Sequence, residues 1–182
     1  MTNMRRFLVL APLALLLAVP LQVQAATRRA PKGWKTYDGP WFSVFYPASW
    51  KATAGKTPAG TGGGKSDAAM FTSPDGSAQF AIYSPMWNGD PTDLNIDPKR
   101  EKLVSRLVTK KKIKANGGNE MATRWQTFRA LNGSYTRSIV DTENITLNAR
   151  HVFGFRYKNA ATYRKFLPQF QKFKASLEQY LD

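Results

Sequence analysis

The segment 123–157 constrains the fold most, because it contains three consecutive strand patterns. The runs 123–131, 134–141 and 145–157 are rich in Thr, Val, Ile and aromatic residues and are separated by short turns. Asn132-Gly133, between the first two runs, is a favoured hairpin turn. One face of the last run carries Leu147, Ala149, His151, Phe153, Phe155 and Tyr157. The pattern predicts an antiparallel meander of three strands.

Shorter strands precede this meander. Residues 41–46 alternate aromatic and small side chains, which predicts a first strand. Residues 69–72 and 79–83 predict a strand pair, joined by the turn Ser73-Pro74-Asp75-Gly76. The chain therefore contains several antiparallel strands before its last third.

Two helices are expected beside the strands. Asp97 can cap a first helix with Pro98 at its first position. Its apolar face would carry Leu103, Val104, Leu107 and Val108, and its basic face Lys99, Lys102, Arg106 and Lys110. A second helix follows Asn159, with aromatic residues every three or four positions and a kink or break at Pro168. Strands and helices together predict the α+β class, an antiparallel β-sheet with helices packed on it.

The N-terminus predicts export. Arg5 and Arg6 precede an apolar run too short to span a bilayer, and small residues end at Ala25, so residues 1–25 read as a signal peptide cleaved near Ala25. We expect residues 26–40 to form a basic arm and 41–182 a single domain, in the periplasm or secreted. Without residues 1–25 the formal net charge falls from +15 to +13, which favours anionic partners and, after export, makes nucleic acid the least favoured of them. With no cysteine, stability must come from packing alone.

Three motifs resemble those of PsbP-like and DcrB-like exported proteins. They are Phe42-Ser43-Val44-Phe45-Tyr46-Pro47 followed by Trp50, then Phe71-Thr72-Ser73-Pro74-Asp75-Gly76, and finally Tyr163, Leu167-Pro168, Phe170 and Ser176-Leu177. The resemblance implies a PsbP-like α/β/α sandwich around an antiparallel sheet. It also implies an accessory or binding protein rather than an enzyme, and it assigns no functional residue.

A glycine-rich segment, Gly60 to Ser66, resembles a phosphate-binding loop. Ala59 stands where the motif needs glycine, and neither a strand before it nor a helix after it is predicted. A flexible loop explains the segment better, and no cofactor is expected.

Oxygen-bearing side chains gather in the loop 84–96 and just after it. They are Asn88, Asp90, Asp93, Asn95 and Asp97. The spacing of Asp93, Asn95 and Asp97 begins like a calcium-binding loop, but Pro98 and Val104 replace its glycine and its glutamate. Turn formation and helix capping account for these residues better, although calcium stays an open alternative at Asp90, Asp93 and Asp97.

Catalytic patterns are weak in this sequence. His151 is the only histidine and lies on the apolar face of its strand, which favours a hydrogen-bonded core residue over a catalytic or metal-ligating one. No spacing of Asp and Glu marks an acid/base pair, but the two carboxylates of a glycosidase need not be neighbours in sequence. No catalytic or metal-binding residue is predicted.

The residues best suited to bind a partner are one tryptophan and a set of cations. Trp87 lies in a loop, where an apolar side chain either contacts a partner or caps the sheet. The cations are Arg28 and Arg29 in the arm and Lys99, Lys102, Arg106 and Lys110 on the first helix, continued by Lys111, Lys112 and Lys114. These residues predict electrostatic docking to an anionic membrane surface or an acidic protein.

The sequence thus favours a basic, exported, non-catalytic binding or accessory protein of the bacterial envelope, which docks electrostatically to an anionic partner or membrane surface. One alternative is an envelope hydrolase or glycan-active enzyme with scattered carboxylates. Another is a secreted effector or inhibitor of an acidic protein.

Overall fold

The computed structural model describes residues 29–55, 66–86, 89–92, 94–113 and 119–180. In chain order its elements are β1 Trp34–Asp38, β2 Phe42–Pro47, β3 Lys51–Ala54, β4 Ala68–Thr72, β5 Ala78–Tyr83, β6 Glu101–Ile113, β7 Asn119–Ala130, β8 Thr136–Asn144, β9 Ala149–Tyr157, α1 Ala160–Ala175 and β10 Glu178–Gln179. The expected signal peptide, Arg28, Trp87 and most of the glycine-rich segment lie outside the described residues.

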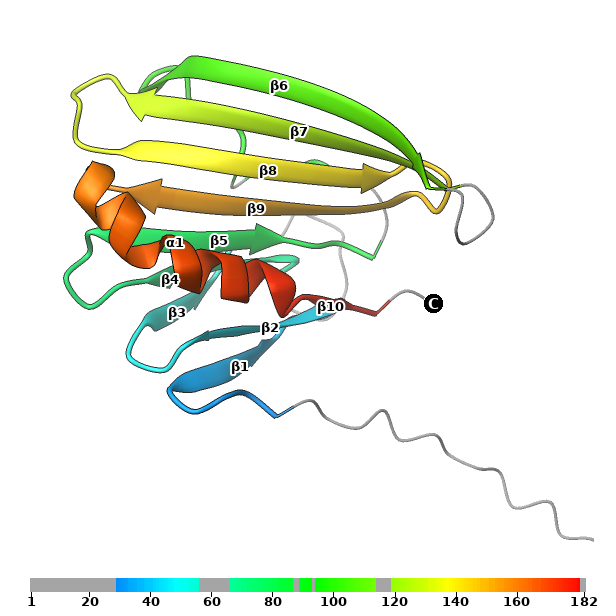
Figure 1. The fold of residues 1–182 in the computed structure, drawn as a ribbon, viewed down its shortest axis with the longest axis horizontal. Helices are drawn as coiled ribbons and strands as arrows, with labels where there is room; N and C mark the ends of the chain where they lie inside the picture. The colour runs from blue at the N-terminus through cyan, green and yellow to red at the C-terminus, as the bar shows by residue number, and fades with distance from the viewer. Residues whose placement is uncertain (1–28, 56–65, 87–88, 93, 114–118, 181–182) are drawn as a thin grey trace, which may run out of the picture.

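The strands form two antiparallel sheets. The larger sheet has the order β3-β4-β5-β9-β8-β7-β6, and the smaller one has the order β1-β2-β10. Figure 1 shows α1 lying across β9 and β5 and leaving β8, β7 and β6 beyond its upper side. The α+β class and the meander expected over 123–157 are confirmed, as β7, β8 and β9.

Aromatic side chains fill the core between α1 and the two sheets. Phe80, Phe155 and Phe173 are fully buried there, and Phe80 contacts Phe155 and Phe173 with ring centroids 5.2 and 5.4 Å apart. Such ring pairs stabilise a core beyond simple burial of area. This cluster replaces the cross-links that a cysteine-free chain lacks.

The opposite face of the larger sheet has its own smaller core. Leu94, only 5 % exposed, inserts from the segment that joins β5 to β6 and packs with Phe128 and Ile139. This segment passes over Gly154, where an added Cβ would lie 3.0 Å from Leu94 Cδ2. Within the described residues, this face is therefore covered by an irregular segment and not by a second helix, so the two helical layers of an α/β/α sandwich are not found.

The expected helix after Asp97 is wrong. Asp97 and Pro98 open a single turn, in which Asp97 Oδ1 accepts from the Lys99 amide at 3.0 Å, and β6 begins at Glu101. Pairing with β7 over the whole length of β6 outweighs the helical spacing of Leu103, Val104, Leu107 and Val108. A β-bulge between Leu103 and Ser105 interrupts the two-residue alternation, which is why the strand resembled a helix in sequence.

The end of the expected basic arm needs a similar correction. Residues 34–38, within the expected arm, form β1, which pairs with β2 from Trp34↔Pro47 to Asp38↔Ser43. Trp34 and Tyr37 are partly buried against the core. Burial of these two rings stabilises the segment as a strand, although its basic composition did not indicate one.

The C-terminal helix agrees with the sequence. Asn159 caps α1 by accepting from the Thr162 amide at 2.9 Å. Pro168 lies inside α1 without splitting it. The helix ends at Ala175, and the hydroxyl of the capping residue Ser176 accepts from the Phe45 amide at 2.8 Å, which ties the helix end to β2.

Candidate functional site

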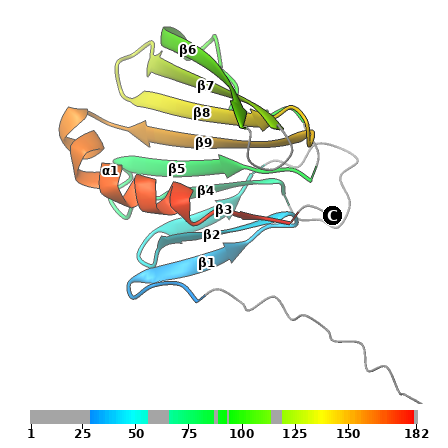
Figure 2. The same ribbon diagram turned by 45° about the vertical axis from the view of Figure 1, so that its right-hand side comes forward.

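The edge strand β6 gathers most of the predicted docking residues that the structure describes. It spans thirteen residues and pairs with β7, and no other described strand pairs along its outer side. Figures 1 and 2 show it at the rim of the larger sheet, away from α1. An exposed edge of this kind offers unpaired backbone amides and carbonyls to a partner.

The two faces of β6 carry different parts of the charge. The register places Arg106, Val108 and Lys110 opposite Gln126, Arg124 and Ala122, on the face away from α1. Lys111 lies on the α1 side with Leu107, and the bulge brings Lys102 to that side as well. The basic helix face expected from the spacing of Lys102, Arg106 and Lys110 thus becomes a strand that is positive on both faces.

Four cations of β6 make no ion pair in the part of the chain that the structure describes. Lys102, Arg106, Lys110 and Lys111 are exposed, and none of them has a described carboxylate within ion-pair distance. Arg129 pairs with Lys102 across the strands and adds a further exposed cation that the sequence could not assign to this set without the register. The edge therefore carries net positive charge.

The remaining predicted docking residues lie elsewhere. Lys99 is in the turn before β6, close in sequence to the set, and Arg29 is exposed ahead of β1. Arg28 and Trp87 fall outside the described residues, so the structure does not place them beside β6. The structure places Lys102, Arg106 and Lys110 on one strand, with Lys102 on the face opposite to the other two.

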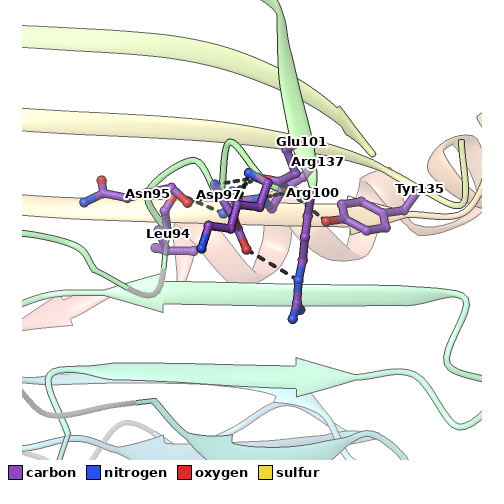
Figure 3. Close-up of polar contacts among 8 residues, drawn as sticks. Leu94, Asn95, Asp97, Arg100, Glu101, Tyr135 and Arg137 are labelled. Atoms are coloured by element: carbon purple, nitrogen blue, oxygen red, sulfur yellow. Dashed lines mark hydrogen bonds and ion pairs between the residues drawn. The ribbon is translucent and has the colours of Figure 1, made fainter. Parts of the chain in front are cut away.

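A buried ion pair fixes the start of β6 (Figure 3). Glu101 and Arg137 are 3 % and 12 % exposed, and Arg137 Nε donates to Glu101 Oε1 at 3.0 Å. Tyr135 also donates to Glu101, while Arg137 donates to the carbonyls of Leu94 and Asn95 at 2.9 Å. One guanidinium thus holds both the edge strand and the segment that covers the sheet.

A second charged cluster lies on the same face of the sheet. Asp141 accepts from Arg150 at 2.9 Å and from Arg124 at 3.2 Å, and Arg124 also pairs with Glu143. Arg150 further donates to the Gly89 carbonyl at 2.7 Å. Asp141 and Glu101 are buried carboxylates, and both are held by arginines in structural roles.

The described part of the expected calcium loop is occupied by internal contacts. Asn95 donates to Asp90 at 2.6 Å, and Arg100 pairs with Asp97 at 3.5 Å. Asn88 and Asp93 lie outside the described residues. Among the residues that are described, no group of three or more His, Cys, Asp or Glu side chains could hold a metal ion.

His151 is a hydrogen-bonded residue near the core, as its position in the sequence predicted. Its Nδ1 lies 3.2 Å from Gln179 Oε1, and because a carbonyl oxygen only accepts, Nδ1 carries the proton. Burial lowers the pKa of His151, and this hydrogen bond partly opposes that effect.

In the described chain, α1 is too short and too polar to span a membrane.

Comparisons with known proteins give a likeness of fold. No protein-family model matches the sequence, and no curated protein is significantly similar to it. The cyanobacterial PsbP of Synechocystis is 13% identical, with a TM-score of 0.48, and the match covers 89% of this chain and 100% of that one. The Saccharomyces cerevisiae Ran-binding protein Mog1p is 6% identical, with a TM-score of 0.37 over 81% of this chain and 96% of that one. A PsbP structure is thus among those that the chain resembles, as the motifs at 42–50 and 71–76 suggested.

Proposed function

We propose that this chain is a non-catalytic binding protein of the bacterial envelope that docks through β6 to an anionic surface. The observation that supports the proposal is the edge strand itself, with Lys102, Arg106 and Lys110 exposed and lacking counter-charges in the described structure. Export by the N-terminal segment would bring this strand to the envelope, where phosphate-bearing lipids and acidic proteins are available.

The expected strength of docking follows from the number of cations. Each Lys or Arg near an anionic surface contributes on the order of 1 kcal/mol, and the effect decays within a Debye length of about 8–10 Å at physiological salt. Lys102, Arg106, Lys110, Lys111 and Arg129 together would give reversible attachment. Such attachment must weaken steeply as salt is added.

The test is co-sedimentation of residues 26–182 with vesicles that contain phosphatidylglycerol, from about 50 to about 300 mM NaCl. The test variant is Lys102→Glu/Arg106→Glu/Lys110→Glu. We expect it to lose vesicle binding that the unchanged chain shows at low salt, because it inverts the charge of the edge strand.

A matched control separates the edge strand from total charge. The variant Lys35→Glu/Lys51→Glu/Arg164→Glu changes three exposed cations on other elements, so the formal charge falls from +13 to +7 in both triple variants. If both variants lose binding equally, the net charge and not β6 is responsible. Binding to envelope fractions without binding to lipid vesicles would favour an acidic protein as the partner.

A further inference from the structure

The sheet face beside α1 contains an apolar row whose outer part no described element covers. Leu107, Trp125 and Val140 are in register on β6, β7 and β8, and Phe153 continues the row beneath α1. Leu107 is 60% exposed and Trp125 39% exposed. The row therefore begins in solvent at the edge strand and ends in the core.

Small hydroxyl side chains border this row on both sides. Thr109, Thr123 and Thr142 lie in register on one side, and Ser105, Thr127 and Ser138 lie in register on the other. Because these neighbouring side chains are short, they do not cover the apolar row between α1 and the edge of the sheet.

Two adjoining hollows lie where the row meets α1. One has a volume of about 350 Å³ and is bounded by Trp125, Phe155 and Leu167. The other has a volume of about 380 Å³ and extends to His151. Val140, Gln171 and Lys174 line both hollows, so the two form one groove along the helix.

Lys174 is the charged group in the middle of this groove. Its ammonium lies 5.3 Å from the centroid of the Phe170 ring, and burial lowers its pKa. No described carboxylate lies within 4.0 Å of it. A half-buried cation without a counter-charge gains most from an anion that enters the same groove.

We propose that this groove binds a single-chain amphiphile with a carboxylate head group, of the fatty-acid class. Its chain lies in the hollow between Trp125 and Leu167, and its carboxylate pairs with Lys174. This site is separate from docking by β6 and goes beyond it.

The dimensions favour a small ligand over a protein segment. A volume near 350 Å³ falls in the lower part of the ~300–1,000 Å³ range of small-molecule sites. A helix with its side chains is about 10 Å wide and would not enter such a hollow. A second copy of the chain would bring two positive β6 strands together, which like-charge repulsion opposes.

The test uses calorimetric titration of residues 26–182 with decanoate below its micelle concentration. We expect one decanoate per chain, and we expect Lys174→Met to weaken binding about tenfold or more, because it removes the ammonium and keeps most of the apolar stem. The matched control is Lys172→Met, because Lys172 lies on the same helix but over the Trp34 ring, outside the groove. This control should bind decanoate like the unchanged chain.

Two further measurements keep the proposal falsifiable. Gln171→Trp fills the groove from the exposed side of α1 and should abolish binding, with unchanged circular dichroism as the check on folding. A neutral decanoyl glucamide should bind more weakly than decanoate and should not respond to Lys174→Met. Absence of decanoate binding, equal losses in the two lysine variants, or full binding by Gln171→Trp would each overturn the site. The β6 triple variant should keep decanoate affinity, so failure of docking does not imply failure here.

Discussion

At the scale of single residues, Arg137 joins the edge strand to the segment that covers the sheet. It pairs with the buried Glu101 and also donates to two carbonyls of the covering segment. Arg137→Met leaves Glu101 without its cation, and breaking a buried pair from one side costs about 3–5 kcal/mol. We expect urea unfolding to show a loss of this size.

The double variant Glu101→Leu/Arg137→Met provides the control for this prediction. It removes both charges, so its loss should be clearly smaller than that of Arg137→Met alone. Equal losses in the two variants would mean that the uncompensated charge is not the cause. Packing of the covering segment would then explain the effect.

His151 predicts a specific dependence of stability on pH. Because burial lowers the pKa of His151 in the folded state, protonation favours unfolding. The stability that neutral His151 supports is fully present above the unfolded pKa of about 6.5 and is lost as the pH falls through and below that value. When the pH is lowered from about 7.5 to about 5, we expect the melting temperature of His151→Gln to fall less than that of the unchanged chain. The Asp75 carboxyl has a pKa of about 2, so its contribution to folding stability is lost only at lower pH and does not affect this comparison.

At the scale of elements, the bulge in β6 provides a test that distinguishes a strand from a helix. Deleting Val104 removes the extra residue and leaves Leu103↔Phe128 and Ser105↔Thr127 as consecutive pairs, so we expect a change within about 1 kcal/mol. Deleting Thr109 instead shifts the residues on one side of the deletion by one position relative to β7, so their side chains change faces of the sheet. Thermal melting should show a far larger loss for the second deletion. Similar losses for the two deletions would contradict the register.

Elements with a clear local sequence pattern were predicted, and features that depend on tertiary contacts or exposure were missed. The strands β7, β8 and β9 were predictable because their composition and their turns agree locally, and α1 because Asn159 and the aromatic spacing mark it. β6 was missed because both of its faces are exposed, so burial does not impose an alternating pattern on it. The groove at Lys174 joins α1 to Trp125 on β7, and only the tertiary arrangement brings these two residues together.

At the scale of the whole molecule, the positive charge opposes compaction while it favours an anionic partner. A chain of formal charge +13 repels itself when folded, and dissolved salt screens that repulsion. We therefore expect the melting temperature of residues 26–182 to rise as NaCl is increased from about 10 to about 300 mM. The two triple charge-reversal variants should both show a weaker rise, because each has a formal charge of +7. Their vesicle binding should nevertheless differ, since only one of them alters β6. If only the β6 variant lost the salt response, the repulsion would be concentrated on the edge strand. Docking of β6 to an anionic surface would then reduce this repulsion and stabilise the fold as well as attach the protein.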